Sequence, residues 1–80
     1  MTYAADTTEA HTVFEVFYID ASTGWALAEY SFFDRDQIGE AMFCYHKRDA
    51  IALAKQLDAD KAVRIFDRHH HLIKTVIGHA

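Results

Sequence analysis

Only one stretch of this 80-residue chain repeats its apolar residues with the spacing of an α-helix. Residues 47–57 place Ala50, Ile51, Ala54 and Leu57 at positions i, i+1, i+4 and i+7, which form a single stripe along a helix. A fold with one short helix must take most of its core from strands. The chain is therefore constrained to a sheet that one helix covers.

Five other segments are rich in β-branched and aromatic residues and are bounded by turn-forming residues, which is typical of strands. They comprise residues 12–20, 25–33, 39–45, 62–66 and 72–77. Gly24 and the polar run at residues 34–37 predict turns between the first three strands. The order β-β-β-α-β-β predicts an α+β fold in which one helix packs on one face of a single antiparallel sheet.

The length of the chain fits one domain, which we expect to span residues 1–80. Residues 1–11 are rich in Thr, Ala and acids and predict a flexible arm. The apolar content of 51% and the aromatic content of 14% exclude a disordered chain. Cys44 is the single cysteine, the first residues lack the pattern of a signal peptide, and no apolar run is long enough to span a membrane. We therefore expect a cytoplasmic protein that does not enter membranes.

The predicted strands carry apolar residues on both faces. A sheet covered by one helix should show one apolar and one polar face, because successive side chains of a strand point to opposite sides. In the first strand, Val13, Phe17 and Ile19 share one face, whereas Phe14, Val16 and Tyr18 share the other. An apolar second face predicts an interface, either with a second copy in a homodimer or with a different protein.

Charge is divided unequally between the two halves of the chain. Residues 1–40 hold eight acids and one base, whereas residues 41–80 hold seven bases and four acids. The acids and aromatics of the first half predict a contact surface for a protein partner. The candidate residues are Glu15, Asp20, Trp25, Glu29, Tyr30, Phe32, Asp34 and Asp36, with Trp25, Tyr30 and Phe32 expected to be exposed.

An acidic surface of this kind can occupy the nucleic-acid site of another protein. We therefore expect a small, non-enzymatic protein-interaction module, for example a phage or mobile-element inhibitor of a host nucleic-acid-handling defence complex. The alternative is direct nucleic-acid binding through the basic second half of the chain. The bases expected to contact the nucleic acid are Arg48, Lys55, Lys61, Arg64, Arg68 and Lys74. The net charge of −4 weakens attraction to phosphate, so we expect no direct binding of nucleic acid.

Two groups of residues raise the question of metal or catalytic chemistry. The run from His69 to His71 fits either a metal site or a polar hairpin turn, and the turn is favoured because neighbouring strand residues point in opposite directions. Cys44 and His46 share a face and resemble a nucleophile and its base, but a catalyst also needs an orienting group and an oxyanion hole. We expect Cys44 to be a small buried residue, and the sequence implies no catalytic residue, no metal and no cofactor.

Three motifs occur in a fixed order: Gly24-Trp25 at the start of a strand, residues 47–51 (KRDAI) at the start of a helix, and residues 63–67 before a final hairpin. In this order they resemble a family of short bacterial and phage proteins of unknown function, over residues 12–77. The resemblance implies a ββ(β)αββ fold, and it places a glycine in the last turn where this chain has His70. By size and acidity the chain is also similar to phage anti-defence proteins, including anti-CRISPR proteins.

Overall fold

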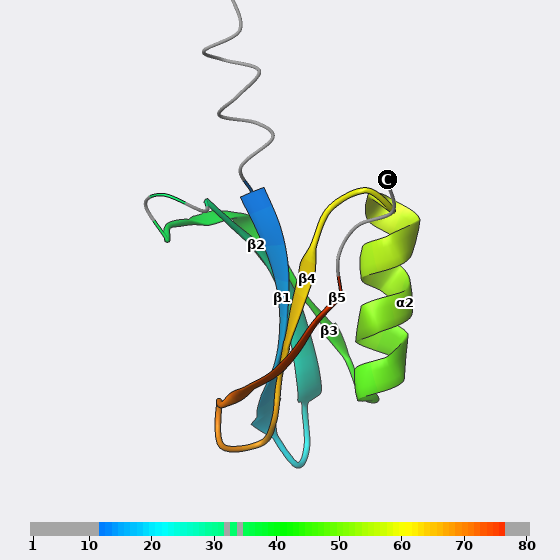
Figure 1. The fold of residues 1–80 in the computed structure, drawn as a ribbon. Coiled ribbons are helices and arrows are strands. Elements are labelled where there is room, and N and C mark those ends of the chain that lie inside the picture. The colour runs from blue at the N-terminus through cyan, green and yellow to red at the C-terminus, as the bar shows by residue number, and fades with distance from the viewer. Residues whose placement is uncertain (1–11, 32, 34, 77–80) are drawn as a thin grey trace, which may run out of the picture.

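The structure is a computed structural model that describes residues 12–31, 33 and 35–76, so the arm expected at residues 1–11 lies outside the described residues. The elements are β1 (Thr12–Asp20), β2 (Gly24–Ser31), β3 (Gln37–Cys44), α2 (Lys47–Leu57), β4 (Val63–Phe66) and β5 (Leu72–Val76) (Figure 1). The predicted α+β order of elements is confirmed, and the helix has the predicted bounds. In the described part of the chain, no helix is long and apolar enough to cross a membrane.

The five strands form one sheet in the order β3-β2-β1-β4-β5. Three neighbouring pairs are antiparallel, but β1 and β4 are parallel. The prediction of a purely antiparallel sheet is therefore wrong at this pair. Two hairpins make β3 run in the same direction as β1, and α2 then carries the chain back, so β4 starts at the same end of the sheet as β1.

The bounds of some strands differ from the predicted ones by one or two residues. β2 ends at Ser31, and Phe33 lies in the turn that follows. β3 begins at Gln37, two residues earlier than expected, because Gly39 sits inside the strand as part of an irregularity in its pairing with β2. Gly39 has a φ of +72°, which is typical of a bulge that glycine permits.

Helix α2 packs on one face of the sheet (Figure 1). The core between the two layers consists of Phe14, Val16, Trp25, Leu27, Ala50, Ala54, Val63 and Ile65. Ala50 and Ala54 of the predicted helical stripe are fully buried, and their small size lets the helix approach the strands closely. Leu57 at the end of the stripe is 48% exposed. The helix therefore seals the middle of the sheet but not its whole length.

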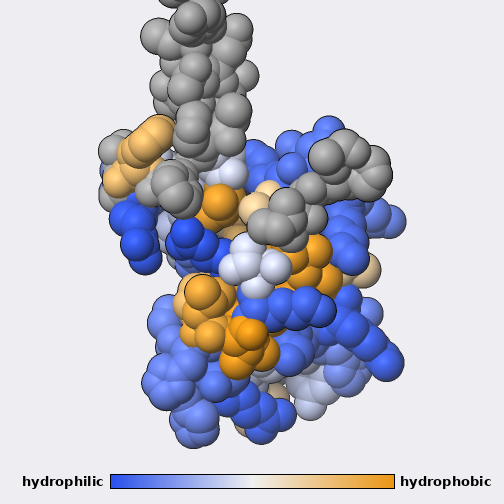
Figure 2. Space-filling view, in the orientation of Figure 1, coloured by the Kyte–Doolittle hydropathy of each residue, from blue (hydrophilic) through white to orange (hydrophobic). Residues whose placement is uncertain are grey.

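No described element covers the opposite face of the sheet, which we call the open face. Ala26 lies between Phe17 and Phe43 on the neighbouring strands and is fully buried. At the centre of this face, Glu15 and Arg64 form an ion pair of 3.7 Å between Oε2 and Nη1. In the orientation of Figure 1, hydrophobic residues form separate areas between hydrophilic ones (Figure 2). The homodimer expected across the open face stays a prediction.

Candidate functional site

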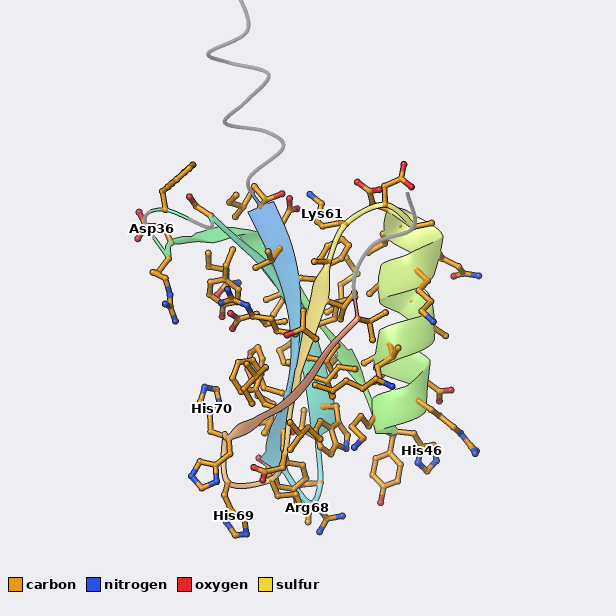
Figure 3. The ribbon with its side chains drawn as sticks, viewed as in Figure 1. Asp36, His46, Lys61, Arg68, His69 and His70 are labelled. Carbon is orange, nitrogen blue, oxygen red and sulfur yellow. The ribbon has the colours of Figure 1, made fainter. Side chains whose placement is uncertain are left out.

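The predicted contact residues do not lie together on one surface. Glu15 and Tyr30 lie on the open face, and Glu29 lies on the face that α2 covers. Asp20 ends β1, whereas Asp36 lies just before β3 at the other end of the molecule (Figure 3). The acids of the first half are therefore dispersed over both faces and both ends of the sheet.

The prediction that three aromatic residues are exposed has a different outcome for each of them. Trp25 belongs to the core and is only 8% exposed, so the expectation that it is exposed is wrong. It shares a face with Leu27, and that face is the one that α2 covers. Tyr30 is half-buried, and Phe32 and Asp34 lie outside the described residues.

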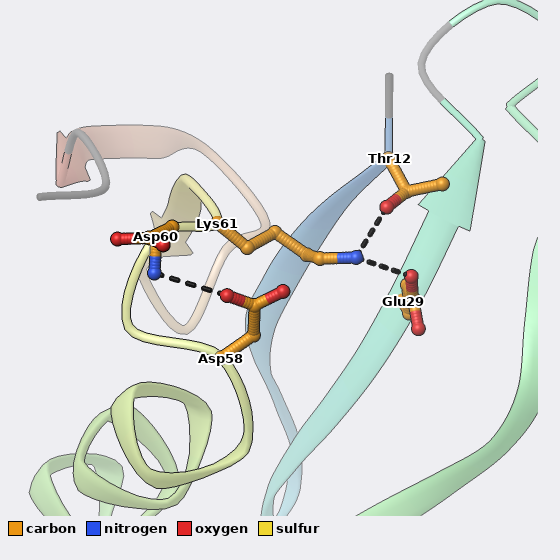
Figure 4. Close-up of polar contacts among 5 residues, drawn as sticks. All are labelled: Thr12, Glu29, Asp58, Asp60 and Lys61. Carbon is orange, nitrogen blue, oxygen red and sulfur yellow. Dashed lines mark hydrogen bonds and ion pairs between the residues drawn. The ribbon is translucent and has the colours of Figure 1, made fainter. Parts of the chain in front are cut away.

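Acids of the first half form ion pairs with bases of the second half. Lys61 Nζ lies 2.6 Å from Glu29 Oε2 and also donates a hydrogen bond to the hydroxyl of Thr12 (Figure 4). Arg64 and Glu15 form a second pair between the two halves of the sequence, and they are neighbours on β4 and β1. The charge separation along the sequence is thus partly neutralised inside the fold.

These surroundings shift the pKa values of two side chains, Glu29 and Tyr30. Burial raises the pKa of Glu29, but hydrogen bonds from Lys61 and Thr12, together with the charge of Lys61, outweigh it, so the pKa lies below its ordinary value. The pKa of Tyr30 is raised by burial and by the nearby charge of Glu15. At neutral pH Glu29 is therefore ionised, as its ion pair requires, and Tyr30 keeps its proton.

A groove of about 430 Å³ opens on the helix side of the sheet, between the end of α2 and the first half of β3. It exists because α2 ends at Leu57, which leaves this part of the sheet uncovered. We call it the acidic groove and define it by Glu29, Ile38, Glu40, Met42, Leu57 and Asp58. Ile38, Met42 and Leu57 are 42%, 41% and 48% exposed, so three large apolar side chains meet solvent around one hollow.

Carboxylates frame these apolar side chains. Glu29, Glu40 and Asp58 line the groove with a single base, Lys61, which is engaged with Glu29. Among the residues that the structure describes, neither Glu40 nor Asp58 forms an ion pair. The Oδ1 of Asp58 accepts the backbone N–H of Asp60 at 3.0 Å, which fixes this carboxylate beside the helix end (Figure 4). The groove therefore combines an apolar floor with an excess of negative charge.

Strand β3 adds a second property to the groove. It is an edge strand of the sheet, and most of its residues are exposed. The outer edge of such a strand presents backbone donors and acceptors to which another extended segment can pair.

Of the groove residues, only Glu29 was among the predicted contact residues. Ile38, Glu40 and Met42 occupy every second position of β3, and sequence reasoning did not single out this spacing.

The three consecutive histidines form the turn between β4 and β5, as the polar-turn interpretation predicts. The backbone N–H groups of His69 and His71 donate to Oδ1 of Asp67 at 2.8 and 2.9 Å. His70 instead stacks its ring on Phe66, with centroids 4.8 Å apart. Within the described residues, no group of three or more His, Cys, Asp or Glu side chains is arranged to hold a metal ion.

The remaining candidates are also separated by the fold. Cys44 packs against the core, whereas the ring of His46 packs against Tyr45 at 5.1 Å. The bases proposed for nucleic-acid binding do not form one face, since Lys61 and Arg68 lie at opposite ends of the molecule (Figure 3). Arg64 lies on the open face in its pair with Glu15.

No family model, curated protein or solved structure matches this chain. The likeness to short bacterial and phage proteins therefore stays a prediction, and the candidate site rests on its own geometry.

Proposed function

We propose that this chain is a non-enzymatic protein-interaction module that holds a basic, apolar segment of a partner protein in the acidic groove. The observation that carries the proposal is the position of Ile38, Met42 and Leu57, exposed around one hollow whose rim bears Glu40 and Asp58. Exposed apolar groups rimmed by polar ones are typical of protein-binding surfaces.

The apolar side chains supply affinity and the acids supply selectivity. Complete burial of such a side chain contributes roughly 1.5–3 kcal/mol, so three that are about half exposed offer roughly 2–4 kcal/mol. The carboxylates attract a positively charged partner and repel an acidic one. A segment that alternates basic and aliphatic residues satisfies both parts of the groove.

A second copy of this chain fits the groove less well than a basic partner does. Pairing two grooves would bring Glu40 and Asp58 of each copy close to those of the other, and like charges across an interface oppose association. The homodimer prediction therefore applies to the open face, where Glu15 is neutralised by Arg64.

The chemistry of the groove suits one class of partner in particular. Proteins that bind nucleic acids present Lys and Arg beside apolar and aromatic side chains. A partner of this class connects the groove with the inhibitor function expected from the sequence. The finer form of the proposal is that the chain occupies the nucleic-acid site of a host defence complex.

Selection from a random peptide display library against the immobilised chain tests the proposal. We expect enrichment of peptides that combine Lys or Arg with aliphatic residues. The variant Glu40→Lys with Asp58→Asn should lose these peptides, because it removes charge from the rim while the new amide oxygen can still accept the N–H of Asp60. Asp49→Lys at the start of α2 is the control and should retain them. Enrichment of acidic peptides, or equal binding by the groove variant, would contradict the proposal.

A further inference from the structure

A second hollow of about 300 Å³ lies toward the end of the molecule opposite to the acidic groove. Its lining includes Tyr18, Trp25, Tyr45, His46, Lys47 and Arg68, and we call it the aromatic pocket. It is built where the β1–β2 turn, the start of α2 and the β4–β5 turn meet. His46 and Arg68 are seen at this end in Figure 3.

Two cations in the pocket lie over neighbouring aromatic rings. Lys47 Nζ is 5.4 Å from the centre of the Trp25 ring, and Arg68 Cζ is 5.0 Å from the centre of the Tyr18 ring. The two rings touch edge to face, with centroids 5.3 Å apart. The packing of the rings therefore brings two cationic groups from distant parts of the sequence to one hollow.

Two carboxylates at this end of the molecule, Asp20 and Asp67, accept hydrogen bonds from the backbone. Asp20 lines the pocket, and its Oδ1 accepts the N–H groups of Ser22 and Thr23 at 3.0 and 2.7 Å. Asp67, next to Arg68, accepts the N–H groups of the histidine turn. In the described part of the chain, neither Lys47 nor Arg68 forms an ion pair. Both cations therefore have capacity for an external anion.

We propose that the aromatic pocket binds a small anion that carries a planar ring, of the class of a mononucleotide. Lys47 and Arg68 would bind the phosphate, since Arg and Lys are the usual phosphate ligands among side chains. Tyr45 is 64% exposed and offers a ring on which a base can stack. Base stacking on an aromatic side chain is worth about 1–3 kcal/mol, and small-molecule pockets begin at roughly 300 Å³.

Trp25 allows a direct test, because it is the only tryptophan of the chain and lines the pocket. Its fluorescence would be followed while AMP, adenosine or inorganic phosphate is added to the intact chain. We expect AMP to change the emission at submillimolar concentration, and adenosine and phosphate to bind at least about tenfold more weakly. If adenosine binds as tightly as AMP, the role of the cations is overturned. If phosphate binds as tightly as AMP, the role of the ring is overturned.

Variants separate this site from unspecific attraction. Lys47→Gln and Arg68→Gln should each weaken AMP binding by about tenfold, as expected for the loss of one charged hydrogen bond. Lys55→Gln removes the same charge from an exposed position of α2 and should leave AMP binding unchanged. Equal losses in all three variants, or no AMP binding by the native chain at about 10 mM, would overturn the proposal. The groove variants of the previous section should bind AMP normally, so the two proposals fail independently.

Discussion

Lys61 reaches across β1 to Glu29 on β2, with 2.6 Å between Nζ and Oε2. The same ammonium group also donates a hydrogen bond to the hydroxyl of Thr12 on β1. One base from the second half of the sequence thus ties the segment before β4 to two strands of the acidic first half. Glu29 and Lys61 also line the acidic groove, so their contact links the stability of the fold to the candidate site.

A double-mutant cycle measures this link. We expect Glu29→Gln and Lys61→Met to show a coupling free energy of about 1 kcal/mol, because both side chains are partly exposed and solvent weakens their attraction. The free energies of unfolding would come from urea denaturation of both single variants and the double variant. The cycle of Glu29→Gln with Lys55→Met is the control and should show no coupling. A Glu29–Lys61 coupling as small as the control value would contradict the structure.

The same pair makes stability depend on pH in a defined direction. The folded pKa of Glu29 lies below its ordinary value of 4.5, so the unfolded chain takes up this proton first on acidification. The stabilisation is complete above the ordinary value and is lost as the pH falls through the folded pKa. The native chain should therefore exceed Glu29→Gln in stability at pH 7, and this difference should shrink on acidification toward pH 2. A difference that stays constant between these pH values would rule out this assignment.

Two glycines have positive φ angles but different surroundings. Gly24 has a φ of +90°, and a Cβ placed there would lie 2.5 Å from the carbonyl oxygen of Tyr45. Gly39 has a φ of +72° with open space around a Cβ. We expect Gly39→Ala to cost about 1–2 kcal/mol of unfolding free energy, the backbone penalty alone, and Gly24→Ala to cost clearly more. Thermal denaturation of both variants checks this order, and equal losses would contradict it.

His70 combines an unfavourable backbone with favourable ring contacts. Its φ is +63°, its ring stacks on Phe66, and an edge contact joins it to Phe17 at 6.0 Å. His70→Ala should lose roughly 0.5–1.5 kcal/mol, because it keeps the strain and removes the stacking. His70→Gly relieves the strain as well, so its stability should lie above that of His70→Ala and near that of the native chain. Urea denaturation of both variants decides, and a less stable glycine variant would be inconsistent with the positive φ.

Local patterns were sufficient to predict the elements but not the direction of every strand. The stripe of Ala50, Ile51 and Ala54 and the β-branched runs identified the helix and five strands. The parallel pair of β1 and β4 was missed because strand direction after α2 depends on how the helix crosses the sheet. His70 has a positive φ in the turn where the resemblance places a glycine, and the resemblance itself stays a prediction.

The candidate site was less accessible to sequence reasoning. Glu29 was selected for its charge. The groove around it depends on how far the end of α2 lies from β3, and no local sequence pattern gives this distance. Trp25 was expected to be exposed, although it lies two residues before the buried Leu27 and therefore on the same face of β2. Acids far apart in the sequence were treated as one surface, whereas the sheet separates Glu15 from Glu29 by placing them on opposite faces.

The central claim is that the acidic groove contacts a basic partner, and site-specific photo-crosslinking tests it most directly. Benzoylphenylalanine would replace Met42 in the groove or, as a matched control, Leu72 on the other edge strand, where the side chain is 53% exposed. Each variant would be irradiated inside the cells that encode the chain. We predict one discrete adduct with a different protein from position 42, through a basic segment of that protein, and none from position 72. The same adducts from both positions, or an adduct of twice the 9.2 kDa chain mass from position 42, would contradict the proposal.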